Sequence, residues 1–387
     1  MLLAATGLVV ILVVLALVAN GSKTPATPDR PVAGSDMFGV SVNRVFNDDF
    51  TPAHWASALQ AVHDSGLRQA RSDAFWGWAE EQPPRDGVHT YRWDRLDQEA
   101  GALAEHGLRW LPILDYSAIW AASDPTNHHS PPTSNDDYAA YAGAFAERYG
   151  RDGSYWSEHP GRDALPVTVY EIWNEPNSRW FWHPKPDPAA YADMYLKARG
   201  AIKAVDPEAV VLVGGLVAHP AFVQKMYAAR PDMRGNVDAI GWHAYAPDVD
   251  GLIRGVRGLR QTLERVGDPE VPIHITELGW PTHGTDKQAK PIVLTEDARA
   301  QALEAAAEAL ARSDCNVRAV IPYTWTTPER NVRDEEDWYG IRHPDGRPTP
   351  TSDALARVVS RWRTDPPTSG DARFKLCGSA PAQRAHP

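Results

Sequence analysis

The chain has 387 residues, which is enough for one large domain of the α/β-barrel kind or for two ordinary domains. Its formal net charge is −11, and this excess of carboxylates argues against nucleic acid as a partner. No phosphate-binding loop, nucleophile elbow or zinc-protease motif occurs in the sequence, so these enzyme classes are excluded as well.

The first predicted element is an apolar segment over residues 2–19, of about the length that a bilayer core requires. No basic residue precedes it and no small-x-small cleavage site follows, so we expect an uncleaved membrane anchor over residues 1–20, with a cleaved signal peptide as the alternative. Residues 21–36 are rich in Pro, Thr, Ser and Gly and predict a flexible linker. With an anchor or with a signal peptide, we expect an exported protein, either held in the membrane and facing outside or secreted. Any contact with the membrane is expected only through residues 1–20.

From residue 37 onward, strand-like and helix-like segments alternate, which is typical of a parallel sheet covered by helices. Predicted strands are 38–42, 67–71, 109–115, 167–173, 210–214, 239–243, 273–277 and 320–325. Predicted helices are 55–65, 93–106, 136–149, 188–205, 249–266, 296–313 and 352–362. Because eight strands close a (β/α)₈ TIM barrel, the sequence predicts a single α/β barrel domain over residues 37–364.

The C-terminal tail, residues 365–387, is rich in Pro, Ser and Ala. Cys315 and Cys377 are the only cysteines of the chain. In an exported protein they permit a disulfide that closes a loop of about 60 residues and would fix the tail beneath the eighth strand. Two separate buried thiols are the alternative.

Two glutamates follow predicted strands directly. Glu175 lies just after the fourth strand and Glu277 ends the seventh. In barrels of this kind the active site forms at the C-terminal ends of the strands, so we expect both carboxylates to converge across the mouth. One carboxylate can attack an anomeric carbon while the other, kept protonated by its charged neighbour, donates a proton to the departing oxygen.

Further polar and aromatic residues follow other strand ends, and aromatic faces suit stacking on pyranose rings. The predicted substrate-binding set is Arg71, Asp73, Trp76, Asp115, Tyr116, Asn174, Trp180, His243, Tyr245, Trp280 and Trp325. Structural roles remain open for several of them: Arg71 could pair with Asp73, His243 and Tyr245 could pack in the core, and Trp180 could pack within its loop. His128 and His129 lack the spaced partners of a metal site, so neither metal nor cofactor is expected.

Three stretches resemble clan A glycoside hydrolases: Trp173-Asn174-Glu175-Pro176, Trp242-His243-Ala244-Tyr245 and Thr276-Glu277-Leu278-Gly279-Trp280. Two more, Arg71-Ser72-Asp73-Ala74-Phe75-Trp76 and Ile113-Leu114-Asp115-Tyr116, are similar to family 39 and its bacterial exopolysaccharide-hydrolase relatives. The resemblance covers residues 38–356.

This resemblance implies a retaining enzyme with Glu175 as acid/base and Glu277 as nucleophile. It further implies that Asn174 binds the 2-hydroxyl of the sugar, that Arg71 and Tyr245 contact the nucleophile, and that Trp325 lies beneath the sugar next to the scissile bond. The loops at residues 117–135 and 179–183 depart from the family pattern, so the sugar stays open.

The sequence therefore predicts hydrolysis of a β-linked polysaccharide or oligosaccharide outside the cytoplasmic membrane, with endo action slightly preferred and a monomer expected. The alternatives are an exo-acting, xylosidase-like β-glycosidase, a transglycosylase, and a non-catalytic glycan-binding surface protein.

Overall fold

The computed structural model describes residues 37–47, 51–285, 293–366 and 374–378. The predicted membrane segment and linker lie outside these ranges, as does most of the predicted tail. Within the described ranges no helix combines the length and the apolar character that crossing a membrane requires.

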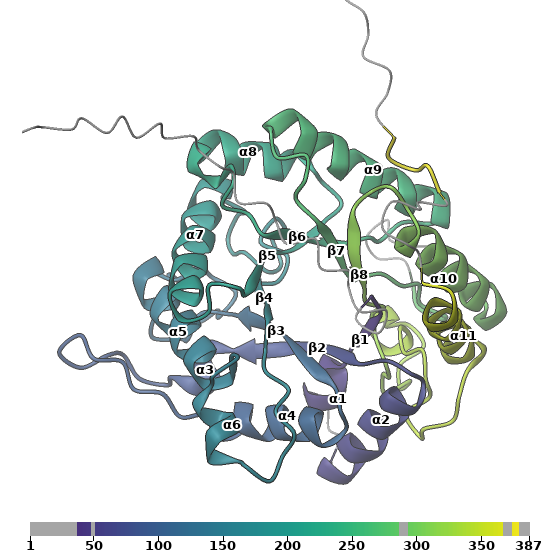
Figure 1. Cartoon of the computed structure of the whole chain (residues 1–387), viewed down its shortest axis with the longest axis horizontal. Coiled ribbons are helices and arrows are strands. Elements are labelled where there is room, and N and C mark those ends of the chain that lie inside the picture. The colour runs from purple at the N-terminus through teal and green to yellow at the C-terminus, as the bar shows by residue number, and fades with distance from the viewer. Residues whose placement is uncertain (1–36, 48–50, 286–292, 367–373, 379–387) are drawn as a thin grey trace, which may run out of the picture. The chain divides into compact units, whose positions relative to one another are not determined.

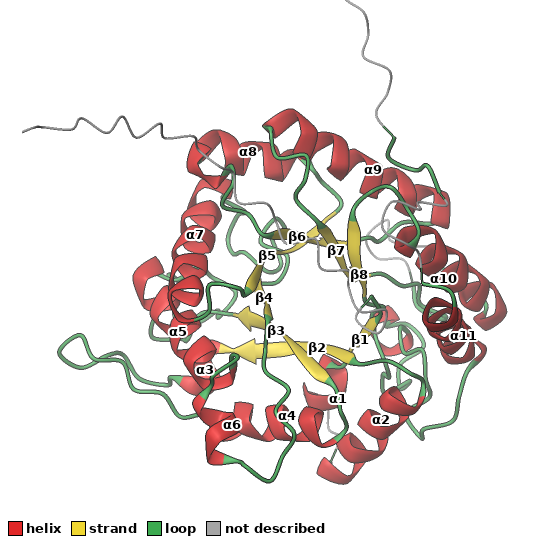
Figure 2. Cartoon of the chain, viewed as in Figure 1, coloured by secondary structure: helices red, strands yellow, loops and turns green. Residues whose placement is uncertain are grey.

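Eight parallel strands form one sheet in which each strand pairs with the next (Figures 1 and 2). They are β1 (Gly39–Ser41), β2 (Gln69–Phe75), β3 (Arg109–Asp115), β4 (Val169–Ile172), β5 (Val210–Val217), β6 (Ala239–His243), β7 (Ile273–Glu277) and β8 (Val317–Val320). A parallel bridge between Phe38 and Val320 brings the last strand back to the first. The (β/α)₈ barrel expected from the sequence is thus confirmed.

Helices surround this sheet in a ring, as Figure 1 shows. They are α1 (Asn43–Asn47), α2 (Pro52–Asp64), α3 (Trp76–Ala79), α4 (Asp94–Glu105), α5 (Asn135–Tyr149), α6 (Ser154–Glu158), α7 (Pro188–Val205), α8 (Ala221–Ala229), α9 (Val249–Val266), α10 (Glu296–Ala311) and α11 (Pro350–Thr364), with 3₁₀ turns η1 (Pro231–Met233) and η2 (Glu335–Trp338). Several begin at a side chain that accepts a backbone N–H, which satisfies donors that the first turn leaves unpaired. These caps are Thr51, Ser134, Asp187, Asp248, Thr295 and Thr349.

The eighth strand differs from the prediction. It was expected at 320–325, but β8 ends at Val320. Beyond Val320 the backbone forms hydrogen bonds to both neighbouring strands. The N–H of Ile321 donates to the carbonyl of Ile275 in β7, and that of Trp325 donates to the carbonyl of Ser41 in β1. The apolar pattern located a buried segment correctly but could not show where the regular ladder stops. Helix α8 was also missed, because its nine residues give too short a pattern to stand out.

A small apolar cluster fills the inside of the barrel. Leu111, Leu212, Ala239 and Ala319 come from β3, β5, β6 and β8 and pack together with Ile321. Strands on opposite sides of a closed sheet can meet only through its interior. The charged site residues described below, Arg71, Glu171 and Glu277, belong to the strands in between, β2, β4 and β7.

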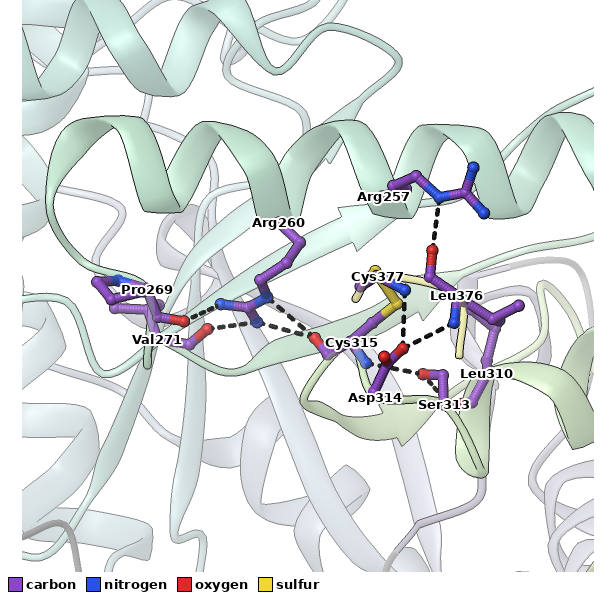
Figure 3. The surroundings of a disulfide bond; sticks show 10 residues. All are labelled: Arg257, Arg260, Pro269, Val271, Leu310, Ser313, Asp314, Cys315, Leu376 and Cys377. Carbon is purple, nitrogen blue, oxygen red and sulfur yellow. Dashed lines mark hydrogen bonds between the residues drawn. A yellow bond between two sulfur atoms is a disulfide. The ribbon is translucent and has the colours of Figure 1, made fainter. Parts of the chain in front are cut away.

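Cys315 and Cys377 form a disulfide across 62 residues of sequence. Figure 3 shows that Asp314 accepts the backbone N–H groups of Leu376 and Cys377, both at 2.7 Å, and that Arg257 of α9 donates to the carbonyl of Leu376. Since Cys315 comes just before β8, these contacts fasten the described part of the tail at the N-terminal ends of the strands. The pairing that the sequence permitted is present.

Candidate active site

A cavity of about 680 Å³ lies at the C-terminal ends of the strands, and every strand contributes to it directly or through the loop that follows. Of the residues predicted to bind or transform a substrate, its lining includes Asp73, Tyr116, Asn174, Glu175, Trp180, Tyr245 and Glu277. The volume is typical of small-molecule sites.

Glu175 and Glu277 meet in this cavity. One carboxylate oxygen of each lies within 4.8 Å of the other. Glu277 is the last residue of β7, whereas Glu175 follows β4 through an unusual turn in which Trp173 has φ 67° and Glu175 has φ 43°. These left-handed conformations are uncommon for residues other than glycine and concentrate at functional sites.

Both oxygens of Glu277 accept hydrogen bonds. The Nη1 atom of Arg71 donates to Oε1 at 2.6 Å, and the hydroxyl of Tyr245 donates to Oε2 at 2.7 Å. Arg71 is fully buried, and its two ion pairs among the described residues are with Glu171 and Glu277. Arg71 therefore supports Glu277 rather than forming the structural pair with Asp73 that the sequence left open.

The contacts of His243 determine which of its two ring nitrogens carries the proton. Its Nε2 atom lies 3.2 Å from Nη2 of Arg71, and its Nδ1 atom lies 2.8 Å from Oε1 of Glu175. Because a guanidinium can only donate, Nε2 must accept and the proton must be on Nδ1. Burial lowers the pKa of His243 to about 4, so near neutral pH a neutral imidazole donates its Nδ1–H to Glu175.

Burial raises the pKa of Glu277, the nearby Glu175 acts in the same direction, and His243, Arg71 and Tyr245 oppose the rise. Two carboxyl groups this close hold one proton between them over part of the pH range. Since Arg71 and Tyr245 already donate to both oxygens of Glu277, we assign that proton to Glu175. This distribution gives one charged and one protonated carboxyl group, as an acid and a nucleophile require.

Glu175, His243 and Glu277 are also close enough to share a metal ion. However, the guanidinium of Arg71 is 2.6 Å from Glu277 and would repel a cation, and the donor atoms are engaged in the hydrogen bonds just described. A second group of described residues with such spacing contains Cys315 and Cys377, which are joined to each other and offer no thiolate. The group formed by Glu175, His243 and Glu277 therefore fits an acid-base pair better than a metal site.

Three of the predicted sugar-contacting tryptophans require correction. Trp76, Trp280 and Trp325 are at most 1% exposed and do not line the cavity. The indole N–H of Trp76 donates to Glu80 and that of Trp280 to the carbonyl of Ala246, both at 2.9 Å. Position after a strand identifies the correct end of the barrel, but it does not show whether a large ring turns into the cavity or packs beneath it.

Asp115 also lies outside the lining and is fully buried. Both its carboxyl oxygens lack a hydrogen-bond partner among the described residues. Burial and the neighbouring Asp73 raise the pKa of Asp115 well above its usual range, which favours the neutral form of this carboxyl group. Asp73 itself lines the cavity and accepts hydrogen bonds from Asn43 at 3.2 Å and Asn47 at 2.6 Å.

Trp180 is the exposed aromatic residue of the cavity lining. It is 54% exposed, and the guanidinium of Arg179 stacks on its ring at 4.9 Å. The neighbouring Trp182, in contrast, is 2% exposed. Substrate contact by Trp180 and by the other lining residues remains a prediction.

Sequence reasoning did not single out several residues of the site. The lining also contains Asn43 and Asn47 of the one-turn helix α1, Glu336 of the 3₁₀ turn η2, and Tyr339 just after that turn. None of these residues belongs to a recognisable sequence pattern. Glu171, the second ion-pair partner of Arg71, was missed although its position gave a signal: it is a charged residue inside an otherwise apolar buried strand.

No family model and no curated protein matches the chain. Solved structures do match it. A glycoside hydrolase family 39 β-xylosidase from Caulobacter crescentus has 22% identity and a TM-score of 0.60, over 84% of this chain and 72% of that one. A family 5, subfamily 18 protein from Streptomyces cattleya, solved in complex with GlcNAc, has 18% identity and a TM-score of 0.61, over 86% and 82%.

The family 53 catalytic domain from Ignisphaera aggregans has 18% identity and a TM-score of 0.55, over 86% of this chain and 98% of that one. At such identities a likeness shows the fold. This chain has the same barrel fold as these clan A glycoside hydrolases.

Proposed function

We propose that this protein is a retaining glycoside hydrolase that cleaves β-glycosidic bonds of a polysaccharide or oligosaccharide by double displacement. The observation that carries the proposal is the approach of Glu175 and Glu277 to within 4.8 Å in the cavity of a barrel shared with glycoside hydrolases. Retaining enzymes have carboxyl groups about 5–5.5 Å apart, whereas inverting enzymes leave room for a water molecule between them.

In the first step the ionised Glu277 attacks the anomeric carbon and forms a glycosyl ester, while Glu175 transfers its proton to the departing oxygen. In the second step Glu175 takes a proton from water, the hydroxide oxygen bonds to the anomeric carbon, and the ester bond to Glu277 breaks. Asn174, whose side-chain oxygen is fixed by Arg71 at 3.2 Å, contacts the 2-hydroxyl, a contact that strengthens in the transition state.

We place the substrate outside the cytoplasmic membrane, because the apolar segment at residues 2–19 and the disulfide suit an exported protein. Trp180 lies in the loop that follows Glu175 and belongs to the same cavity, which supports contact with a sugar on the leaving-group side and hence action on a chain. A binding site for a sugar on the leaving-group side favours an oligosaccharide or polysaccharide substrate over a monosaccharide glycoside.

Intact-protein mass spectrometry with 2-deoxy-2-fluoro glycosyl fluorides tests this function, because such reagents form the glycosyl ester but release it slowly. We expect a mass gain on the peptide that contains Glu277, and no gain in Glu277→Gln. Azide should restore turnover to Glu277→Ala with inverted product configuration, and to Glu175→Ala with retained configuration. Full activity of Glu277→Gln would refute the assignment, and an adduct on another residue would refute it as well.

A further inference from the structure

Glu171 is a buried charge that the two-carboxylate mechanism does not use. It lies in β4, is fully buried, and its Oε2 atom accepts from Nε of Arg71 at 2.6 Å. Its Oε1 atom accepts from the hydroxyl of Thr276 at 3.0 Å. A Cβ atom added at Gly241 of β6 would lie 2.8 Å from Oε1, so the glycine leaves the room that this carboxylate occupies.

Stability alone is a weak explanation for such an arrangement. Glu171, Arg71 and Glu277 form a buried triad of two carboxylates on one guanidinium. Removing charges from water costs several kcal/mol per ion, and well-packed apolar residues in place of a buried triad are often as stable or more so. The geometry of the triad therefore suggests a role in the reaction.

Arg71 transmits the position of Glu171 to the site. A guanidinium is planar and rigid, so anchoring Nε fixes the directions of both terminal nitrogens. Nη1 then points at Glu277, and Nη2 lies 3.2 Å from both the side-chain oxygen of Asn174 and Nε2 of His243. A rotation of Arg71 would disturb three groups of the proposed site together.

Glu171 also competes with Glu277 for the positive charge of Arg71. The other titratable groups that face Glu171 are Asp115, Tyr191, His243 and His274. Burial lowers the pKa of both histidines to about 4, and it raises the pKa of Asp115 and of Tyr191 well above their usual ranges. The two histidines and Tyr191 are therefore neutral near neutral pH, and the shift of Asp115 favours its neutral form, so the charge balance depends mainly on Glu171, Arg71 and Glu277.

We propose that Glu171 is a positioning residue for the reaction: it orients Arg71 toward Glu277 and takes up part of the charge of Arg71, so that Glu277 stays a basic nucleophile. This inference rests on the proposed function. Its two parts, orientation and charge, make different predictions for two substitutions of the same residue.

Glu171→Gln keeps the shape and an oxygen that can accept from Arg71, but it removes the charge. The charge of Arg71 then acts on Glu277 alone and stabilises its ionised form. We expect the pKa of Glu277 to fall, so that the acidic limb of the kcat/KM profile moves to lower pH, and kcat for glycosylation to decrease at the plateau because a less basic carboxylate is a poorer nucleophile.

Glu171→Ala removes the anchor as well as the charge. We expect kcat to fall by about 10²-fold, the loss typical of a reacting group displaced by about 1 Å, with a much smaller change in KM. The matched control is Glu80→Gln, because Glu80 is also a buried carboxylate but is bonded by Trp76 and His89. This control should leave the acidic limb unchanged.

An acidic limb and a plateau in Glu171→Gln that both match the parent protein would overturn the proposal, and so would a limb displaced to higher pH. Thermal unfolding of each variant shows whether it is folded, and Glu171→Gln decides the question if the alanine variant is not. Formation of the fluorosugar adduct at Glu277 in the parent protein tests the proposed function independently of Glu171.

Discussion

The Nδ1 atom of His243 lies 2.8 Å from the Oε1 atom of Glu175, at the end of a hydrogen-bond chain that begins at Arg71. The chain has a fixed direction, because Arg71 donates to Nε2 of the neutral imidazole and leaves its proton on Nδ1. The ring thus favours the ionised form of Glu175, the form that the proposed second step requires as a base. It also holds one oxygen of that carboxylate in place.

This relationship predicts the effect of removing the imidazole. In His243→Ala the ionised form of Glu175 loses its donor, so the basic limb of the pH–rate profile should move to higher pH. Release of the glycosyl ester should slow by about 10- to 100-fold, a modest part of the usual contribution of acid-base catalysis, because Glu175 loses the contact that holds its carboxylate in place and a larger fraction of it is protonated. Pre-steady-state kinetics would show the ester accumulating as a burst. A basic limb at the parental pH would contradict the assigned direction of the chain.

Trp180 gives a prediction about substrate length. If its exposed ring supports a sugar on the leaving-group side, Trp180→Ala should lose on the order of 1 kcal/mol of binding to oligosaccharides and raise their KM about fivefold. Aryl glycosides without a sugar at that position should be unaffected. Trp180→Phe serves as the control that restores stacking. Equal losses on both kinds of substrate would indicate a role in loop packing instead.

Glu99 of α4 gives a prediction about stability and pH. Burial raises the pKa of Glu99 from 4.5 to about 8, although its ion pair with Arg95 opposes the rise. The folded protein therefore holds this proton more tightly than the unfolded chain. The resulting stabilisation is fully present below about pH 4.5 and is lost as the pH rises through about 8, by on the order of 1 kcal/mol for each pH step of one between these two values.

Urea unfolding at several pH values would measure this loss. The variant Glu99→Gln cannot ionise and should show a flatter dependence on pH, with its advantage over the parent largest at the alkaline end. Glu81→Gln, a change at an exposed carboxylate, is the control and should follow the parent curve. Parallel curves for Glu99→Gln and the parent would show that the buried group does not titrate in this range.

The disulfide predicts a change in stability without a change in catalysis. It closes a loop with a separation of 62 residues, so replacing both Cys315 and Cys377 by Ala should lower the free energy of unfolding by up to about 4 kcal/mol in the chain-entropy model. The kinetic constants should persist, because the bond lies at the opposite end of the strands from the cavity. Mass analysis after alkylation without reductant should find no free thiol, and alkylated cysteines would exclude the bond.

The barrel could be predicted because each β-α unit carries its own local signals. Short continuous apolar runs such as that of β3 indicate buried strands. Glycines such as Gly66 and Gly107, which have φ of 93° and 65° after α2 and α4, mark the ends of helices. Both signals are local and require no knowledge of tertiary contacts. The same logic placed Glu175 and Glu277 at the mouth, since the C-terminal ends of parallel strands gather at one end.

The orientation of individual side chains at that end could not be predicted. Trp180 and Trp325 are both tryptophans that lie beyond the C-terminal end of a strand, yet one is 54% exposed and the other 1%, because the packing of distant loops decides which ring is covered. Asn43 and Asn47 reach the cavity through a helix of only five residues, which has no periodic pattern to detect. Local sequence contains little information about contacts of this kind.

The left-handed turn after β4 has a consequence for the evolution and engineering of this chain. A residue with a side chain at φ 43°, as Glu175 has, stores roughly 1 kcal/mol or more of backbone strain that glycine would relieve. Glu175→Gly should therefore be more stable than Glu175→Ala, although neither retains the carboxyl group that the proposed mechanism uses. At this position selection for stability favours glycine, whereas selection for the proposed activity favours glutamate. Screens that select for stability alone would therefore tend to remove that activity.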